Sequence, residues 1–166
     1  MTSDFRETGF GDMAKLDEID RKLLSLLQND ERLSLAELGE AIGIPASTVN
    51  DRIKRMRRNG IITGFHAQVS PEALGLNLLA FMLVSWSSPK VEPVFLKKIN
   101  ASPAVLECHH ITGAWNYLLK VRVGTTRDLE KFLADIVKSV DGIERTETLI
   151  ALSSPKETSK VVLAEE

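Results

Sequence analysis

The sequence predicts an α+β protein in which a small all-helical unit precedes a larger unit of strands and helices. Two observations predict this division. Apolar residues recur every three to four positions up to about residue 60, whereas from residue 78 apolar runs of strand length alternate with helical segments. The chain has 166 residues, of which 43% are hydrophobic and 27% are charged, and its formal net charge is −2. Such a composition is ordinary for a globular chain with one or two cores.

We expect three helices in the first unit, over residues 16–28, 35–42 and 46–59. Ser34 and Glu37 have the spacing of a capping box, which fixes the start of the second helix. Gly43 can adopt the positive φ that ends this helix, and Pro45 suits the first turn of the next. A short helix, a tight turn containing glycine and a second helix together form the helix-turn-helix signature.

The third predicted helix is strongly basic, with five cations and no acid between residues 52 and 58. A basic helix face is usually only solvated, but the capped helix and glycine turn before it favour binding to DNA phosphates. We therefore expect double-stranded DNA as a partner. The predicted contact residues are Ser47, Thr48, Asn50, Asp51, Arg52, Lys54, Arg55 and Arg58. Asp51 repels phosphate unless it pairs with Lys54 or Arg55, which we favour, or accepts from a cytosine amine.

The segment after the basic helix, residues 61–69, has strand-like residues around Gly64. It is expected to form a wing or a connecting strand. We therefore predict a winged helix-turn-helix DNA-binding domain over residues 15–64. A flexible arm is expected over residues 1–14, and a linker strand and hinge over residues 65–75.

The second domain, residues 76–166, is expected to be ferredoxin-like. Strands are predicted over residues 78–86, 105–111, 117–123 and 143–152, and helices over residues 92–101 and 129–137. This is the order β-α-β-β-α-β. Residues 78–86 are apolar on both faces although the helices need to cover only one, so the other face is expected to meet a second subunit. Residues 161–163 offer a further edge strand.

The sequence lacks the features of several other classes of protein. No apolar run reaches the roughly 18 residues of a membrane helix, and the N-terminus has no signal-peptide core. The single cysteine, Cys108, fits a reducing cytoplasm. At most two of Cys108, His109 and His110 face one side of a strand, whereas a structural zinc site needs four ligands. Without a phosphate loop, nucleophile elbow or paired carboxylates, we expect no cofactor, no metal and no enzymatic activity.

Four segments together resemble the leucine-responsive regulatory protein/AsnC (Lrp/AsnC) family of prokaryotic transcriptional regulators. They are residues 16–24, 52–56, 59–65 and 112–119, and the resemblance extends over residues 15–155. It implies a DNA-binding protein whose second domain dimerises and senses a small metabolite, commonly an amino acid. It also implies that dimers assemble into tetramers or octamers. The alternatives are a sirohaem decarboxylase, which is an enzyme of the same two-domain architecture, and a sensor module that has lost DNA binding. The basic helix argues against both.

The resemblance also implies an effector site, formed by Gly113, Ala114, Asn116, Thr146 and Thr148. Asn116 stands where the family usually has an aspartate, and an amide cannot pair with an α-ammonium group as a carboxylate does. A second departure lies at the start of the basic helix, where the family often has serine followed by proline. This chain has Pro45 and Ala46 there, which leaves Ser47 or Thr48 to satisfy the first helical amides.

Overall fold

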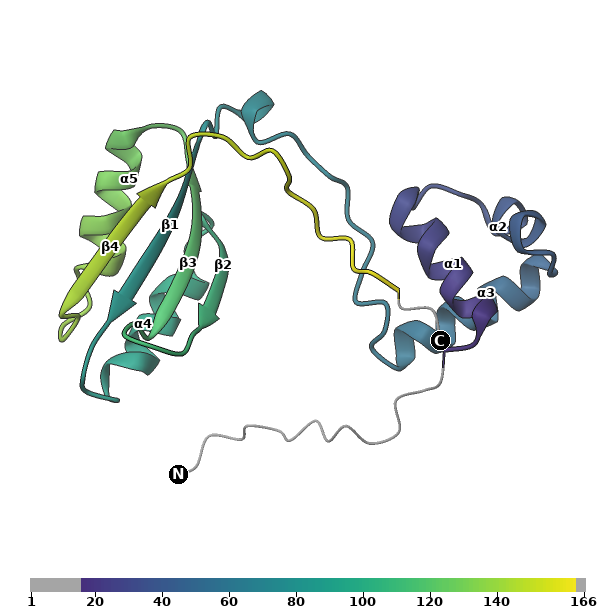
Figure 1. The fold of residues 1–166 in the computed structure, drawn as a ribbon, viewed down its shortest axis with the longest axis horizontal. Helices are drawn as coiled ribbons and strands as arrows, with labels where there is room; N and C mark the ends of the chain where they lie inside the picture. Colours follow the sequence, from purple (N-terminus) through teal and green to yellow (C-terminus); the bar gives the residue numbers. More distant parts are fainter. Residues whose placement is uncertain (1–15, 164–166) are drawn as a thin grey trace. The chain divides into compact units, whose positions relative to one another are not determined.

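The structure is a computed structural model that describes residues 16–163, so the arm expected over residues 1–14 lies outside the described residues. The chain divides into two compact units, and each is described by itself (Figure 1). The first unit contains residues 16–67 together with residues 158–163, and the second contains residues 68–157. Residues 158–163, which were expected to belong to the second domain over residues 76–166, group with the first unit.

The first unit is the predicted bundle of three helices. They are α1 (Glu18–Asn29), α2 (Leu35–Ile42) and α3 (Ala46–Arg58). One residue or more from each helix is completely buried in their common core, namely Leu23, Leu38, Val49 and Met56. The capping box of Ser34 and Glu37 is present, and Asp17 and Asp20 form a second one at the start of α1. Both helix starts are thus fixed by side chains that accept from backbone amides.

The turn between α2 and α3 depends on two glycines. Gly43 ends α2 in the left-handed region, with φ 75°. Gly39 is buried within α2, where an added Cβ would lie only 2.5 Å from the backbone oxygen of Ile44. The helix α3 begins at Ala46 as predicted, but Pro45 caps it without a side-chain hydrogen bond. Among the described residues, neither the Ser47 nor the Thr48 side chain makes a hydrogen bond with the first amides of α3. The expectation that one of them caps this helix is therefore wrong.

The predicted wing strand is absent from the described chain, because residues 61–69 have no regular secondary structure. Instead, the backbone amides of Ile61 and Ile62 both donate to the Met56 carbonyl, at 2.9 and 3.3 Å. Their side chains pack against the helical core. The segment therefore continues the end of α3 rather than pairing with a strand, and only a short 3₁₀ turn, Glu72–Leu74, precedes the sheet.

The second unit is a four-stranded antiparallel sheet with the predicted ferredoxin-like connectivity (Figure 1). Its strands are β1 (Leu78–Ser85), β2 (Val105–His110), β3 (Tyr117–Val123) and β4 (Arg145–Ile150), in the order β2-β3-β1-β4. Its helices are α4 (Val91–Asn100) and α5 (Thr126–Phe132), and α5 continues into a π-helical turn, Leu133–Val137. The four strands and two helices of the predicted β-α-β-β-α-β order are present, with their ends shifted by up to three residues.

Both helices pack on one face of the sheet. Alternate residues of β1, Ala80, Met82 and Val84, are completely buried with Phe95 and Ile99 of α4. The residues between them point to the other face, because strand side chains alternate. We call this other face the open face and define it by Leu79, Phe81, Leu83, Lys120 and Arg122, which the register places side by side. Phe81 and Leu83 are half-buried and belong to neither core cluster.

An ion-pair network lies on the open face. Glu157 contacts Lys120 at 2.6 Å and Arg122 at 2.9 Å. Glu107 contacts Lys120 at 3.0 Å, and Glu72 contacts Arg122 at 3.3 Å. The side chain of Arg122 is only 5% exposed, so these carboxylates neutralise a nearly buried charge.

The expected edge strand at residues 161–163 does not form, since this segment binds the first unit. The Gln28 side chain forms two hydrogen bonds with the backbone of Val161, donating to its carbonyl at 3.2 Å and accepting from its amide at 2.8 Å. Lys160 donates to the Asn29 side chain at 2.9 Å, and Leu163 packs against the helical core. The side-chain amide of Gln28 thus satisfies the backbone groups of Val161 that a neighbouring strand would have paired with.

Candidate DNA-reading helix and effector pocket

The cations of α3 fall into two groups, of which the first is bound to α1. The Arg52 guanidinium lies 2.6 Å from Asp17 and 2.9 Å from Asp20, and the Arg55 guanidinium lies 2.5 Å from Asp20. Asp20 is completely buried. These hydrogen bonds raise the pKa of Arg52, with the largest contribution from Asp17. The two arginines therefore hold the basic helix against α1 through a carboxylate that has no contact with solvent.

The second group of cations faces solvent. Lys54, Arg57 and Arg58 are exposed and make no ion pair with any residue that the structure describes. Ser47, Asp51, Lys54 and Arg58 follow one another at spacings of four, three and four residues, so they lie along one side of the helix. We call this side the outer face of α3. Thr48 and Asn50 beside it are half-buried.

Two expectations about α3 need correction. Arg52 was expected at the DNA surface, but its side chain is 20% exposed and is bound to Asp17 and Asp20. Asp51 was expected to pair with Lys54 or Arg55. It pairs with neither, and Arg55 contacts Asp20 instead. The basic run alone did not show these contacts, because the carboxylates lie more than 30 residues earlier in the chain.

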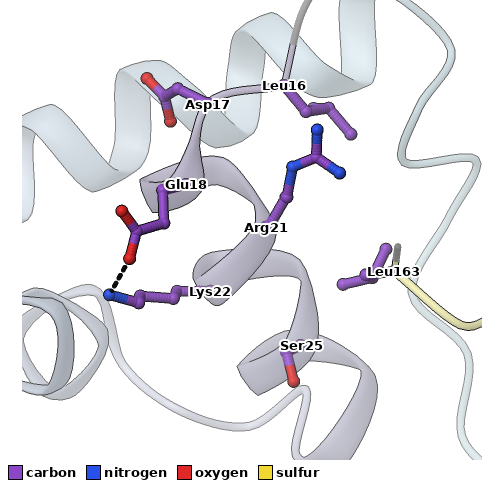
Figure 2. A pocket seen from close by; sticks show the side chains of 7 residues that line it. All are labelled: Leu16, Asp17, Glu18, Arg21, Lys22, Ser25 and Leu163. Atoms are coloured by element: carbon purple, nitrogen blue, oxygen red, sulfur yellow. Dashed lines mark ion pairs between the residues drawn. The ribbon is translucent and has the colours of Figure 1, made fainter. Parts of the chain in front are cut away.

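A surface pocket of about 600 Å³ lies on α1 within the first unit (Figure 2). It is lined by Leu16, Asp17, Glu18, Arg21, Lys22, Ser25 and Leu163. Glu18 and Lys22 form an ion pair of 2.6 Å across one side of it, and both side chains are mostly exposed. None of the predicted DNA-binding or effector residues lines this pocket, and its charged side chains do not converge on one point.

The predicted effector loop connects β2 to β3. Asn116 is held there by three hydrogen bonds: its backbone amide donates to Val84 at 2.9 Å, its carbonyl accepts from Ile111 at 3.0 Å, and its Oδ1 accepts from the Trp86 amide at 2.8 Å. Gly113 has φ 108° and is exposed, as is Ala114. The structure therefore brings these three predicted residues together in one loop at the end of β1.

The two predicted threonines lie elsewhere. Thr146 and Thr148 pair with Val84 and Met82 of β1, so they share the helix-covered face and are half-buried. β1 separates their strand from β3, which follows the loop. The loop reaches β4 through another pair of residues, since the Arg145 guanidinium lies 4.6 Å from the centre of the Trp115 ring. The prediction that both threonines join the loop in one site is not supported by this arrangement.

A second pocket, of about 170 Å³, lies beside Asn116. It is lined by Trp86, Ser87, Pro89, Glu92, His110 and Asn116. Behind it, the buried Tyr117 ring stacks on Trp86 at 5.6 Å and on His110 at 4.9 Å, and its hydroxyl donates to Glu92 at 2.5 Å. Burial, followed by the Glu92 hydrogen bond, raises the pKa of Tyr117, so the phenol stays protonated. Sequence reasoning missed Glu92 and His110, which come from separate elements and share no motif.

The part of the chain that the structure describes has no metal-binding cluster and no membrane-spanning helix. Cys108 and His110 face the same side of β2, since they pair with Leu119 and Tyr117, and His109 faces the other. No group of three or more histidine, cysteine or acidic side chains is close enough there to hold a metal ion. Within residues 16–163, every helix is too short or too polar to cross a membrane.

Comparison with known protein families accounts for both units. Residues 16–63 match the family model of a winged helix-turn-helix DNA-binding domain, and residues 79–161 match that of the Lrp/AsnC ligand binding domain. The chain belongs to the Lrp/AsnC family. It is an Lrp/AsnC-type DNA-binding transcriptional regulator, as both domains and its relatives show.

The named relatives of this Lrp/AsnC protein are regulators. The HTH-type transcriptional regulator FL11 of Pyrococcus furiosus is 39% identical over 146 residues, covering 88% of this chain and 95% of that protein. The leucine-responsive regulatory protein of Klebsiella pneumoniae is 31% identical over 150 residues, covering 89% and 92%. Neither is an enzyme by its name, and the sirohaem decarboxylase alternative receives no support from them.

Solved structures agree with this Lrp/AsnC assignment. Transcriptional regulator NMB0573 of Neisseria meningitidis, solved as an L-methionine complex, has a TM-score of 0.85 and 30% identity, covering 89% of this chain and 97% of that one. AsnC of E. coli has a TM-score of 0.82 and 32% identity, covering 88% and 98%. The fold of the described residues is therefore that of the family.

Proposed function

We propose that this Lrp/AsnC regulator is a cytoplasmic homodimer that reads double-stranded DNA with the outer face of α3. We further propose that a small metabolite, of the amino-acid class, binds at the second domain and alters DNA binding. The observation that carries the proposal is the exposed outer face of α3, with its cations unpaired among the described residues. In helix-turn-helix proteins, residues near the start of this helix meet base edges, and later cations contact phosphates.

We propose different roles for the residues of the outer face. Ser47, with Thr48 and Asn50 beside it, lies in the first turns of α3, where base contacts are made. Lys54 and Arg58 lie further along and are placed for phosphate contacts, with Arg55 contributing through the exposed part of its side chain. Asp51 lies between the two groups, where its carboxylate suits a cytosine amine and disfavours phosphate.

The open face supports the homodimer. Phe81 and Leu83 are incompletely buried there, and Leu149 at the same face is 49% exposed. Apolar residues that gather on one exposed surface are typical of subunit contacts. A two-fold dimer places two recognition helices in successive major grooves, about 34–36 Å apart, on a pseudo-palindromic site. Assembly of dimers into tetramers or octamers is part of this proposal.

The effector proposal is supported by solved relatives. The Neisseria meningitidis regulator and the feast or famine regulatory protein of M. tuberculosis are both described as complexes with L-methionine. In this chain, Gly113 and Ala114 of the loop are exposed, and the half-buried Asn116 lines the second pocket. We propose that the effector binds at this loop. Thr146 and Thr148 do not contact the effector in this proposal and influence the loop only through the neighbouring strands.

The DNA proposal is tested with substitutions on two sides of the helical unit. Arg58→Ala is expected to weaken binding to every sequence and to reduce the slope of log K against log salt by about one. Ser47→Ala should change base preference rather than salt dependence. The measurement is fluorescence anisotropy at several salt concentrations, with DNA from upstream of the protein's own coding region and with unrelated DNA.

Lys22→Ala is the matched control, because it removes an exposed cation from α1 in the same unit. It should leave both the affinity and the salt slope unchanged. If Lys22→Ala and Arg58→Ala reduced the salt slope equally, the outer face of α3 would not be the DNA-binding surface.

A further inference from the structure

The pocket beside Asn116 contains one carboxylate and one amide with complementary unused groups. Oδ1 of Asn116 already accepts from the Trp86 amide. Since a backbone amide can only donate, this contact fixes which end of the Asn116 side chain is the oxygen. The amide nitrogen makes no hydrogen bond among the described residues and remains able to donate to a ligand. Asn116 thus offers a donor in the pocket rather than the acceptor that an aspartate would provide.

Glu92 supplies the acceptor. One of its oxygens accepts from Tyr117 at 2.5 Å, and no other described residue forms a hydrogen bond or ion pair with this carboxylate. A carboxylate has about four lone-pair sites, so most of the acceptor capacity of Glu92 is unused. Glu92 is half-buried and lines the pocket. A carboxylate in that position favours a cation, because the neutral Tyr117 phenol does not compensate its charge.

Aromatic side chains form a rigid wall of the pocket around Glu92. Trp86 and His110 line the pocket, and the Tyr117 ring lies between them, stacked on both. The Tyr117 ring is thus covered on both faces, so Glu92, and not this ring, is the group that attracts a cation. Trp86 is only 8% exposed, so its ring is fixed in position by the core and not by the ligand.

We infer that this pocket binds the ammonium and carboxylate groups of a free α-amino acid, with Glu92 receiving the ammonium group and the Asn116 amide donating to the carboxylate. The inference rests on the proposed metabolite response and states which end of the site holds the ammonium group of the ligand and which end holds its carboxylate. The carboxylate that the family usually carries in the loop is thereby replaced by one from α4. Ligands without a free ammonium group should bind poorly.

The test is isothermal titration calorimetry on the full-length protein with L-methionine and N-acetyl-L-methionine, which lacks the ammonium charge. We expect N-acetyl-L-methionine to bind wild type at least tenfold more weakly than L-methionine. Glu92→Gln, which removes only the charge, should weaken L-methionine binding at least tenfold and leave N-acetyl-L-methionine binding unchanged. The control Glu130→Gln changes an exposed glutamate on α5 and should bind L-methionine as wild type does.

Each contrary outcome has a distinct meaning. Equal binding of the two ligands to wild type overturns the inference without any variant. Unchanged L-methionine binding by Glu92→Gln also overturns it, while the proposed metabolite response stands and its site lies elsewhere. If wild type binds neither L-methionine nor any other standard amino acid with a measurable heat, both the inference and the proposed amino-acid response fail. In that case DNA binding by α3, measured separately, still decides the rest of the proposed function.

Discussion

Two carboxylates, Asp20 in the helical unit and Glu92 in the sheet unit, show how similar groups serve different ends. Both lie in the first turn of a helix. Asp20 is completely buried, and its two oxygens accept from Arg52 and Arg55. Glu92 is half-buried and accepts from one neutral hydroxyl. A buried carboxylate whose oxygens are all used fixes the fold, whereas one that is partly satisfied beside a pocket retains capacity for a ligand.

The comparison is tested first by removing the charge of Asp20. Asp20→Asn leaves Arg52 and Arg55 without their buried partner, so the free energy of unfolding should fall by about 3 kcal/mol. Glu18→Gln is the control on the same helix, where an exposed pair with Lys22 is broken, and it should leave the free energy of unfolding nearly unchanged because solvent screens that pair. Urea unfolding followed by circular dichroism measures both. Equal losses would mean that burial does not separate the two carboxylates.

A smaller effect is expected when the single partner of Glu92 is removed. Tyr117→Phe deletes one hydrogen bond and should lower the free energy of unfolding by about 1 kcal/mol, because Glu92 can be hydrated instead. L-methionine binding should be retained, since the carboxylate keeps its charge and gains an unused oxygen. Calorimetry alongside urea unfolding gives both quantities. Loss of ligand binding with a preserved fold would show that the hydroxyl, and not the carboxylate, contacts the ligand.

Glu157 is an intermediate case, with two cationic partners but a side chain that is 40% exposed. The hydrogen bond from Lys120 lowers the pKa of Glu157 below its ordinary value of 4.5. A lowered pKa in the folded state gives stability that is present above the unfolded-state pKa and is lost as the pH falls through the folded-state value. The loss should therefore occur at acidic pH, below about 4.5.

Glu157→Gln should reduce the acid sensitivity of unfolding. Solvent screening keeps the expected difference below about 1 kcal/mol, the smallest of the three effects. Urea unfolding at about pH 6 and about pH 3 measures it, with Glu130→Gln as the exposed control. Some acid sensitivity should persist in Glu157→Gln, because the His109 and Lys120 hydrogen bonds also lower the pKa of Glu107. An unchanged pH dependence would indicate that Glu157 contributes nothing to the open face.

The sequence predicted the structural features that depend on residues close to one another along the chain. The capping box of Ser34 and Glu37 and the turn at Gly43 are patterns of a few residues, and all three have the predicted roles. The four strands and two helices of the second unit follow from the period of their apolar residues. The family resemblance predicted an effector loop in addition, which spacing alone did not indicate.

What the sequence did not predict depends on contacts between distant segments. Arg52 and Arg55 were expected at the DNA surface as part of a basic run with no acid between residues 52 and 58, yet Asp20 reaches both from α1. Residues 161–163 had strand-like composition but found their partner in Gln28. Glu92 became a candidate only when the fold placed it beside Tyr117. In each case the contacting residue lies on another helix or strand, and the spacing of residues along one element gives no information about contacts between elements.

The close approach at Gly39 has a consequence for genetic screens of this regulator. Any side chain there meets the Ile44 carbonyl at 2.5 Å and must move α2 away from the turn into α3. Such a variant retains every residue of the outer face but presents them at another angle to the groove. A screen for lost repression or activation will therefore score Gly39 among the DNA-recognition positions, although it has no side chain and is buried under α3. In the proposed mode of DNA binding, position 39 sets the angle of α3 without contacting DNA.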